Sequence, residues 1–334
     1  MKNEALVFTL KNRQGSYVKI TNYGGIVMSL AVPNRNGELS DVVLGYDTPE
    51  EYMEGNPCYF GAICGRFANR IRGGRFLIDG REHSVDKNEN GNTLHGGSRG
   101  FDKRFFDAEQ CGCKLYLRLV SEDGDMGFEG RLEVTVCYEF TDDNELKISY
   151  EAVCDKDTVV SLTNHSYFNL AGHDSGKSVE DHILSIAADG FIPIDGASIP
   201  LGSVRPVDGT PFDFRKPTAV GLRLNEHSEQ LQNGSGYDHC FAFGDTSKAV
   251  ATLYEPLSGR KLEVFTDMPA IQLYSGNYIG NKKGKGGAPY KNRSGLALET
   301  EFYPNSPNVP SFPSPVLRAG ETYRHWTSYR FSCE

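Results

Sequence analysis

The chain has 334 residues, with 44 acidic and 35 basic side chains and a formal net charge of −9 at pH 7. This charge argues against a general nucleic-acid or anionic-membrane binder, because neither partner is attracted by a negative field. No stretch approaches the ~18 apolar residues needed to span a bilayer. The apolar content is typical of a globular protein and excludes disorder, collagen and coiled coil.

The N-terminal residues and the cysteines point to the cytoplasm. The first residues contain no apolar run followed by a small-residue cleavage site, as a secretory signal would. None of the eight cysteines forms a C-x2-C pair with zinc-ligand spacing. We therefore expect a cytoplasmic protein with reduced cysteines, in which asparagine sequons have no meaning.

Taken in chain order, the first helix signal is Thr48-Pro49-Glu50-Glu51, a capping box with proline at the first helical position. A second helix is predicted over residues 220–232, with Gly234 as its stop. Strict alternation of apolar and polar residues predicts half-buried antiparallel strands at 115–119, 132–140, 146–150 and 262–264.

Glycine accounts for 37 residues, and much of it falls in two-residue turn signals. These are Asn36-Gly37, Asp79-Gly80, Asn90-Gly91 and Ser258-Gly259. Asn-Gly and Asp-Gly supply the positive φ angles of tight hairpins. With no alternation of strands and helices, and no repeat of fixed period, we predict an all-β fold. It is a large antiparallel β-sandwich with few short helices, formed by residues 1–334 as a single domain.

Two histidines stand out because each lies beside apolar or glycine-rich sequence. His165 follows an apolar run and precedes Tyr167, so it is either a satisfied buried histidine or a general acid. His95 precedes Gly96-Gly97, where paired glycines indicate a backbone that something approaches closely. We expect these glycines and Gly100 to clear space beside the site.

Acidic and basic residues in similar segments complete the candidate set. Glu299 and Glu301 follow apolar residues and share one face of a predicted strand. Either the two close carboxylates raise the pKa of one of them, as an acid or base requires, or they lie on the solvated face of an edge strand. Arg66 and Arg70 either form ion pairs with surface acids or bind ligand oxygens through the paired N–H donors of the guanidinium group.

The remaining sequence signals weaken cofactor and phosphate chemistry. Residues 280–287 are rich in glycine and lysine but lack the order and the following helix of a phosphate-binding loop, so we interpret them as a flexible loop. Metal-ligand spacings and a nucleophile elbow are also missing. The candidate side chains suit a polyhydroxylated ligand, which leaves catalysis and binding equally open.

Seven short motifs, found in order along most of the chain, resemble the aldose 1-epimerase (galactose mutarotase) family. They are Asn69-Arg70-Ile71, Leu94-His95-Gly96-Gly97, Gly100-Phe101-Asp102-Lys103-Arg104, Asn164-His165-Ser166-Tyr167-Phe168-Asn169-Leu170, Gly209-Thr210-Pro211-Phe212-Asp213-Phe214, Tyr237-Asp238-His239 and Leu298-Glu299-Thr300. Any one of them is weak evidence, but the ordered series is specific.

The resemblance implies a galactose mutarotase-like β-supersandwich that interconverts the α and β anomers of free aldohexoses such as glucose and galactose. It implies Glu299 as general base and His165 as general acid. Arg70, His95 and Asp238 would hold the sugar, and Asn69 would support Arg70 or the ligand. No cofactor, metal, nucleic acid or membrane is implied, and we expect a monomer or homodimer.

Two positions depart from the family pattern. This chain has Glu301 where glutamine is common, and Phe105-Phe106 where tryptophan is common. Three other hypotheses stay open from the sequence. They are a hexose 6-phosphate epimerase using Lys282, Lys283 or Lys285, a non-catalytic sugar-binding protein, and a glycosidase using Glu299 with Asp238 or Glu301.

Overall fold

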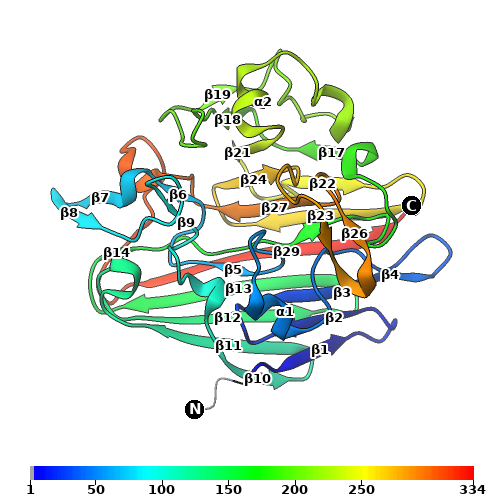
Figure 1. Cartoon of the computed structure of the whole chain (residues 1–334), viewed down its shortest axis with the longest axis horizontal. Coiled ribbons are helices and arrows are strands. Elements are labelled where there is room, and N and C mark those ends of the chain that lie inside the picture. Colours follow the sequence, from blue (N-terminus) through cyan, green and yellow to red (C-terminus); the bar gives the residue numbers. More distant parts are fainter. Residues whose placement is uncertain (1–3) are drawn as a thin grey trace.

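The computed structural model describes residues 4–334, and its largest element is a nine-stranded antiparallel sheet (Figure 1). Its strands, in spatial order, are β10 (Asp107–Cys111), β11 (Lys114–Ser121), β12 (Leu132–Phe140), β13 (Glu145–Cys154), β29 (Thr322–Cys333), β23 (Arg260–Thr266), β22 (Ala251–Tyr254), β17 (Ile183–Ile186) and β20 (Thr218–Ala219). The four predicted strands are confirmed within β11, β12, β13 and β23.

A six-stranded antiparallel sheet forms the second main layer. It consists of β16 (Tyr167–Phe168), β27 (Leu296–Glu301), β24 (Ala270–Tyr274), β21 (Asp238–Ala242), β18 (Gly190–Ile192) and β19 (Arg205–Pro206). A four-stranded sheet adds β1 (Val7–Lys11), β2 (Tyr17–Thr21), β3 (Val27–Pro33) and β4 (Leu39–Asp41).

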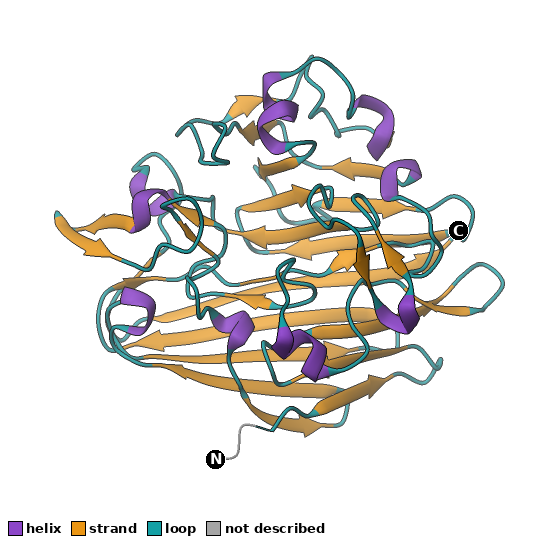
Figure 2. Cartoon of the chain, in the orientation of Figure 1, coloured by secondary structure: helices purple, strands orange, loops and turns teal. Residues whose placement is uncertain are grey.

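Short strand pairs and turns complete the chain, and strands dominate it throughout (Figure 2). The pairs are β5 (Ile63–Cys64) with β15 (Thr163–Asn164), β6 (Arg70–Ile71) with β9 (Thr93–Leu94), β7 (Arg75–Ile78) with β8 (Arg81–Ser84), β14 (Thr158–Val159) with β28 (Val316–Leu317), and β25 (Lys282–Lys283) with β26 (Pro289–Tyr290). Single 3-10 turns lie at Arg72–Gly74, Phe101–Lys103, Asp125–Gly127, Val179–Asp181, Val220–Arg223, Lys285–Gly287 and Ser306–Asn308.

One hydrophobic core joins the nine-stranded and six-stranded sheets, which confirms the predicted antiparallel sandwich. Val134, Val136 and Tyr138 of β12 belong to the same buried cluster as Leu298 of β27. The Tyr329 hydroxyl in β29 donates to the Leu298 carbonyl oxygen at 2.8 Å, so the two layers are also joined by a hydrogen bond.

The other face of the six-stranded sheet carries polar side chains, because successive residues of a strand point to opposite faces. In β27, Leu296 and Leu298 belong to the core cluster, whereas Glu299 lines a pocket on the opposite side. In β24, Ile271 and Leu273 belong to the core cluster, while Gln272 lines that pocket. The alternation of side chains therefore gives the six-stranded sheet one face in the hydrophobic core and one polar face that lines the pocket.

The first predicted helix is confirmed and the second is wrong. Helix α1 (Pro49–Glu54) begins after Thr48, and both hydrogen bonds of the capping box form. Residues 220–232 do not form one helix: a 3-10 turn covers Val220–Arg223, and α2 (Glu229–Gly234) begins only after Ser228. Polar residues 225–228 interrupt the apolar spacing, so the segment breaks there.

Tight turns fall where the sequence predicted them, but the glycines near His95 serve another backbone segment. Asp79 and Gly80, between β7 and β8, have φ angles of 50° and 81°. A Cβ on Gly96 would lie 1.9 Å from the Gly65 carbonyl oxygen. Gly96, Gly97 and Gly100 are not among the pocket-lining residues, so the expectation that they clear space for a ligand is wrong.

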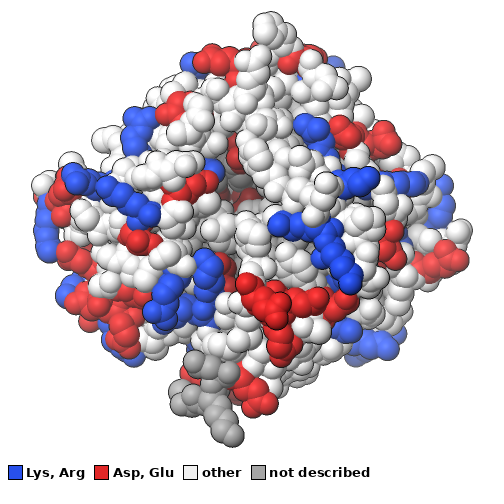
Figure 3. Space-filling view, in the orientation of Figure 1, with Lys and Arg blue, Asp and Glu red and all other residues white. Residues whose placement is uncertain are grey.

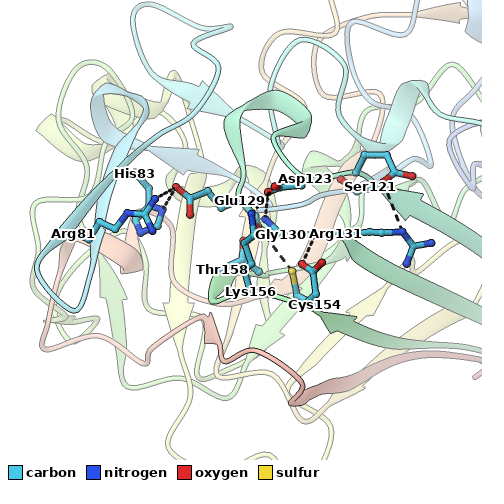
Figure 4. A network of polar contacts seen from close by, with 12 residues as sticks. Arg81, His83, Ser121, Asp123, Glu129, Gly130, Arg131, Cys154, Lys156 and Thr158 are labelled. Carbon is cyan, nitrogen blue, oxygen red and sulfur yellow. Dashed lines mark hydrogen bonds and ion pairs between the residues drawn. The ribbon is translucent and has the colours of Figure 1, made fainter.

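Arg66 is buried inside the fold at 1% exposure and binds backbone oxygens. Its guanidinium donates to the carbonyl oxygens of Glu129 at 2.8 Å and Ser121 at 3.1 Å. The side-chain carboxylate of Glu129 contacts Arg81 and His83 (Figure 4). Arg66 thus closes the turn between β11 and β12, and both functions considered for it from the sequence are wrong.

The cysteine side chains and the helices complete the description of the fold. All eight cysteines are free thiols, at positions 58, 64, 111, 113, 137, 154, 240 and 333. Within residues 4–334, no helix has the length and apolar character needed to cross a membrane.

Candidate active site

A cavity of about 410 Å³ opens on the polar face of the six-stranded sheet. The space-filling view shows this side of the molecule hollowed near its centre (Figure 3). Residues from β6, β9, β16, β21, β24 and β27, from α2 and from the loops around them line the cavity. They are Pro57, Cys58, Tyr59, Asn69, Arg70, Glu89, Asn90, Leu94, His95, His165, Tyr167, Gly196, Ala197, Ser198, Asn233, Asp238, Gln272, Tyr274, Tyr278 and Glu299.

Glu299 lies on the floor of this cavity and is 2% exposed. It is directly opposite Gln272 in the register between β27 and β24. Its Oε2 is buried without a hydrogen-bond partner, which leaves this oxygen free for an incoming proton donor. The solvated-edge interpretation of the Glu299 and Glu301 pair is wrong, because β27 lies between two other strands and both carboxyl groups are buried.

His165 directly follows β15 and faces Glu299. Its Nε2 lies 3.5 Å from Oε2 of Glu299. The backbone is fixed on both sides, since His165 N–H donates to the Ala62 carbonyl and its own carbonyl accepts from Gly61 N–H. The Tyr167 ring lies nearly parallel to the imidazole, with centroids 5.0 Å apart. These contacts fix the imidazole opposite the carboxylate.

The proton affinities of these two side chains are shifted in opposite directions. Burial raises the pKa of Glu299 well above its ordinary range, and Glu301 and Asp238 add to this while Arg70 opposes it. Burial lowers the pKa of His165 to about 4. Both shifts follow from the cost of holding an unpaired charge away from water. Over a wide pH range the two groups therefore hold one proton between them.

Glu301 lies beside Glu299 on β27 but is directed below the cavity wall. It is fully buried, and its Oε1 accepts a hydrogen bond from Asn69 Nδ2 at 3.0 Å. Burial raises the pKa of Glu301 to about 8, opposed by this hydrogen bond. Glu301 thus supports Asn69 through a buried acceptor oxygen.

Asn69 connects several groups of the site through its own backbone and side chain. It adopts a positive φ of 61°, which asparagine tolerates better than most residues. Its side-chain Oδ1 accepts from the Arg70 N–H at 2.9 Å. Its backbone N–H donates to Nδ1 of His95 at 3.1 Å. Because Nδ1 is the acceptor, the ring proton of neutral His95 resides on Nε2.

Arg70 and Asp238 are each held by a partner that the sequence analysis did not single out. Arg70 donates from Nε and Nη2 to the two carboxylate oxygens of Glu89, at 2.6 and 2.8 Å. Asp238 accepts at Oδ1 from Gln272 Nε2 at 2.6 Å. Burial raises the pKa of Asp238, whereas Arg70 and this hydrogen bond lower it. Both predicted binding side chains are therefore pre-oriented.

The whole chain is similar to proteins of one known family. The family model described as aldose 1-epimerase matches residues 6–330. The chain is 44% identical to mouse galactose mutarotase over 328 residues, which covers 97% of this chain and 93% of the relative. It is 40% identical to the Escherichia coli aldose 1-epimerase over 334 residues, covering 98% and 95%.

The chain belongs to the aldose 1-epimerase family. It is a carbohydrate isomerase with mutarotase activity. The crystal structure of an aldose epimerase homologue from C. elegans superposes with a TM-score of 0.91 at 30% identity, covering 99% of both chains. A galactose 1-epimerase from Lactobacillus acidophilus gives a TM-score of 0.87 at 28% identity, covering 99% of this chain and 98% of that chain.

In this enzyme, every predicted site residue lines the one cavity: Glu299, His165, Arg70, His95, Asp238 and Asn69. Sequence reasoning missed Gln272, Glu89 and the ring of Tyr167. A glutamine within the otherwise apolar segment Ala270–Leu273 was the available signal for Gln272. Glu89 gave no such signal, because it lies in a polar loop. Phe105 and Phe106 do not line the cavity.

A metal fits this site poorly. His95, His165 and Glu299 place potential ligand atoms within 4.8 Å of one another. A cation would need a lone pair on the cavity-facing nitrogen of His95, yet the hydrogen bond from Asn69 puts the proton there. The cavity instead presents a hydrogen-bond donor at this position.

Proposed function

We propose that Glu299 and His165 are the acid and base that interconvert the α and β anomers of free aldohexoses, galactose and glucose among them. The observation that carries this assignment is the 3.5 Å approach of His165 Nε2 to Glu299 Oε2 on the floor of a polar cavity. The names of the relatives, galactose mutarotase and aldose 1-epimerase, support the substrate class.

The reaction needs one proton removed and one delivered. Ionised Glu299 takes the proton of the anomeric hydroxyl, while protonated His165 gives a proton to the ring oxygen and the C1–O5 bond breaks. The open-chain aldehyde then rotates about C1–C2. In ring closure His165 recovers the proton from O5, and Glu299 returns one to O1 of the other anomer. Each such group contributes about 10²–10⁴-fold.

The shifted pKa values suit both steps. A carboxylate with a raised pKa is a stronger base toward a sugar hydroxyl, and an imidazolium with a lowered pKa is a stronger acid toward the ring oxygen. After ring opening, Glu299 is protonated and His165 neutral, which is the state that burial favours for each. The protonation state that burial favours and the state that starts the reaction thus differ by the transfer of one proton between Glu299 and His165.

Arg70, His95 and Asp238 hold the sugar hydroxyls, with Asn69 as a positioning residue. Arg70 and His95 bring hydrogen-bond donors to the cavity and Asp238 brings acceptor oxygens, so a hydroxyl-rich ring meets both kinds of partner. Holding C1 near the acid and base converts proton transfer into an intramolecular step. A loss of this orientation raises KM and lowers kcat together.

The architecture argues against the three alternative functions. Among the described residues that line the cavity, Arg70 is the single cation, and Glu89 neutralises it. Lys285 is buried against Asp41, with Nζ 2.6 Å from its carboxylate, so it offers nothing to a phosphate. A binding protein would not need Glu299 and His165 together. A glycosidase pairing Glu299 with Glu301 is disfavoured because Glu301 does not line the cavity, and one pairing Glu299 with Asp238 would leave His165 without a task.

We further propose that residues 1–334 act as one domain, as a monomer or a homodimer, in the cytoplasm. One core cluster includes residues from Leu10 to Phe331, and this span supports one domain. Light scattering on the purified chain distinguishes the two oligomeric states.

Replacement of the base tests the assignment. We expect Glu299→Gln to lower the kcat for mutarotation of fresh α-D-galactose at least ~100-fold, measured by polarimetry in dilute buffer. Sugar binding, followed by saturation-transfer NMR, is expected to persist because the amide fills the same space. Near-normal turnover in this variant would overturn the role of Glu299.

A further inference from the structure

Within residues 4–334, the imidazolium form of His165, which starts the proposed reaction, has one charged partner. Glu299 Oε2 lies 3.5 Å from Nε2, whereas Nδ1 is buried without a hydrogen-bond partner on another described residue. A protonated imidazole carries an N–H donor on each nitrogen, so one of its two donors has no acceptor. The neighbouring His95 ring, with its centroid 5.3 Å away, is neutral and adds no negative charge. A buried cation with so few partners needs stabilisation from another source.

Two tyrosine rings lie nearly parallel to this imidazole. The centroid of Tyr167 is 5.0 Å and that of Tyr59 is 6.0 Å from the centroid of His165, each with an interplanar angle of 22°. The face of an aromatic ring is negative and attracts a cation within about 6 Å of its centroid. The Tyr274 centroid lies farther away, at 6.4 Å, and its ring meets the imidazole at 80°. Tyr59 and Tyr167 are therefore the rings placed to act on a charge on His165.

The backbone holds Tyr59 in a conformation that a bulky residue rarely adopts. Its φ is 55°, in the left-handed region, which persists only where the surroundings enforce it. Its N–H donates to the Asn56 carbonyl at 2.9 Å, and the Asn56 side chain bonds both backbone groups of Phe60. The Phe60 ring packs edge-on against Tyr167, with centroids 5.0 Å apart. One short segment thus places Tyr59 beside His165 and supports Tyr167.

The surroundings of the two rings strengthen their attraction for a charge on His165. Tyr167 is 2% exposed, and both tyrosines line the cavity. An aromatic face attracts a cation more strongly where water is excluded. Lys103 Nζ also lies 6.0 Å from the Tyr59 centroid, but its side chain is 43% exposed, so water and salt screen that contact. The buried imidazolium is screened far less.

We propose that Tyr59 and Tyr167 are positioning residues that stabilise the imidazolium form of His165 through the faces of their rings. This proposal rests on the proposed function, in which protonated His165 gives a proton to the ring oxygen of the sugar. Burial favours the shared proton on Glu299, and the two rings shift it toward His165, where the reaction requires it. Removal of a ring leaves fewer molecules in the reactive protonation state.

The test reads the pKa of His165 in the absence of its charged partner. In Glu299→Gln, His165 titrates without a carboxylate at Nε2, and its Cε1–H signal is followed by NMR as the pH is changed. The signal is identified by its absence in His165→Asn. Tyr59→Leu and Tyr167→Leu are each added to Glu299→Gln, and Tyr59→Phe and Tyr167→Phe are the matched variants that keep the ring.

Tyr23→Leu, also added to Glu299→Gln, is the control for the loss of a tyrosine elsewhere. Tyr23 is buried, packs against Phe105 with centroids 5.1 Å apart, and does not line the cavity. We expect Tyr23→Leu to leave the pKa of His165 at its value in Glu299→Gln.

We expect each of the two Leu variants at the imidazole to lower the pKa of His165 by about 0.4–1.5 pH units, the range of a cation–π contact. The Phe variants are expected to match Glu299→Gln. The direction of the shift separates attraction from packing, because a smaller side chain admits water, and hydration raises the pKa of a buried histidine. An unchanged or higher pKa in a Leu variant would overturn the role of that ring.

The substitutions at Tyr59 and Tyr167 are also made in the wild type and measured by polarimetry on fresh α-D-galactose. We expect kcat to fall about 2- to 30-fold with Leu and to stay within about twofold with Phe. A lower kcat together with an unchanged pKa of His165 would show a packing role and overturn the proposal. Full activity of Glu299→Gln would overturn the proposed function instead, and the NMR titration would still decide whether the rings stabilise the imidazolium.

Discussion

The backbone N–H of Asn69 donates to Nδ1 of His95 across 3.1 Å and so determines what His95 presents to the cavity. The His95 N–H donates in return to the Asn69 carbonyl at 3.0 Å, so the two residues are joined twice. Burial and the nearby His165 and Arg70 lower the pKa of His95 well below its ordinary value. His95 is thus a neutral donor through Nε2 and not a proton-transfer group.

The first prediction follows from this tautomer. His95→Gln extends an amide N–H to the place of Nε2, whereas the shorter His95→Asn accepts from Asn69 but reaches no sugar. We expect KM to rise about 10-fold in His95→Asn and less in His95→Gln, the size of one lost hydrogen bond. Steady-state polarimetry measures both, and equal losses in the two variants would contradict the assigned tautomer.

The second prediction concerns pH dependence. The negative charge of Glu301 contributes to the raised pKa of Glu299. Glu301→Gln removes that charge while keeping an oxygen for the Asn69 amide, so the pKa of Glu299 falls. The proton shared by Glu299 and His165 is then lost at lower pH.

We therefore expect the alkaline limb of the kcat/KM profile to move to lower pH in Glu301→Gln. The acid limb, set by protonation of both members of the pair, is expected to move less. The check is a full pH profile on galactose. Coincident profiles for the wild type and Glu301→Gln would show that Glu301 does not act on Glu299.

The third prediction concerns Glu89, which orients Arg70 through two hydrogen bonds. Glu89→Gln replaces the paired carboxylate with a single acceptor oxygen, so the guanidinium loses its fixed direction. We expect KM to rise about 3- to 10-fold with a smaller change in kcat. Glu82→Gln is the matched control, since Glu82 is exposed and 3.7 Å from Arg75. A change in kcat alone would contradict a positioning role for Glu89.

The fourth prediction concerns stability. Arg66→Met keeps much of the side-chain volume but leaves the carbonyl oxygens of Ser121 and Glu129 without their buried donor. We expect the free energy of unfolding to fall by about 2–6 kcal/mol, about 1–3 kcal/mol for each of the two carbonyl oxygens, measured by urea denaturation. The exposed pair of Arg118 with Glu109 provides the control, because Arg118→Met is expected to cost at most about 1 kcal/mol. Equal losses of unfolding free energy in Arg66→Met and Arg118→Met would show that the buried hydrogen bonds of Arg66 stabilise the fold no more than an exposed ion pair does.

The sequence alone determined the local features of this protein. Alternation along 132–140 predicted β12, and Thr48 with Glu51 predicted the start of α1, because both signals depend on neighbours within a few residues. The same period-two rule predicted that Glu299 and Glu301 share a face. The ordered motifs added the family and the six site residues.

Only the tertiary structure decided what each polar side chain meets. Arg66 and Arg70 are close together in the sequence, yet one binds buried carbonyls and the other lines the cavity, because their partners come from distant loops. Gln272 reaches Asp238 and lies opposite Glu299 through strand register, which no local pattern encodes. Burial and charge, and so the raised pKa of Glu299, likewise depend on residues brought together by folding.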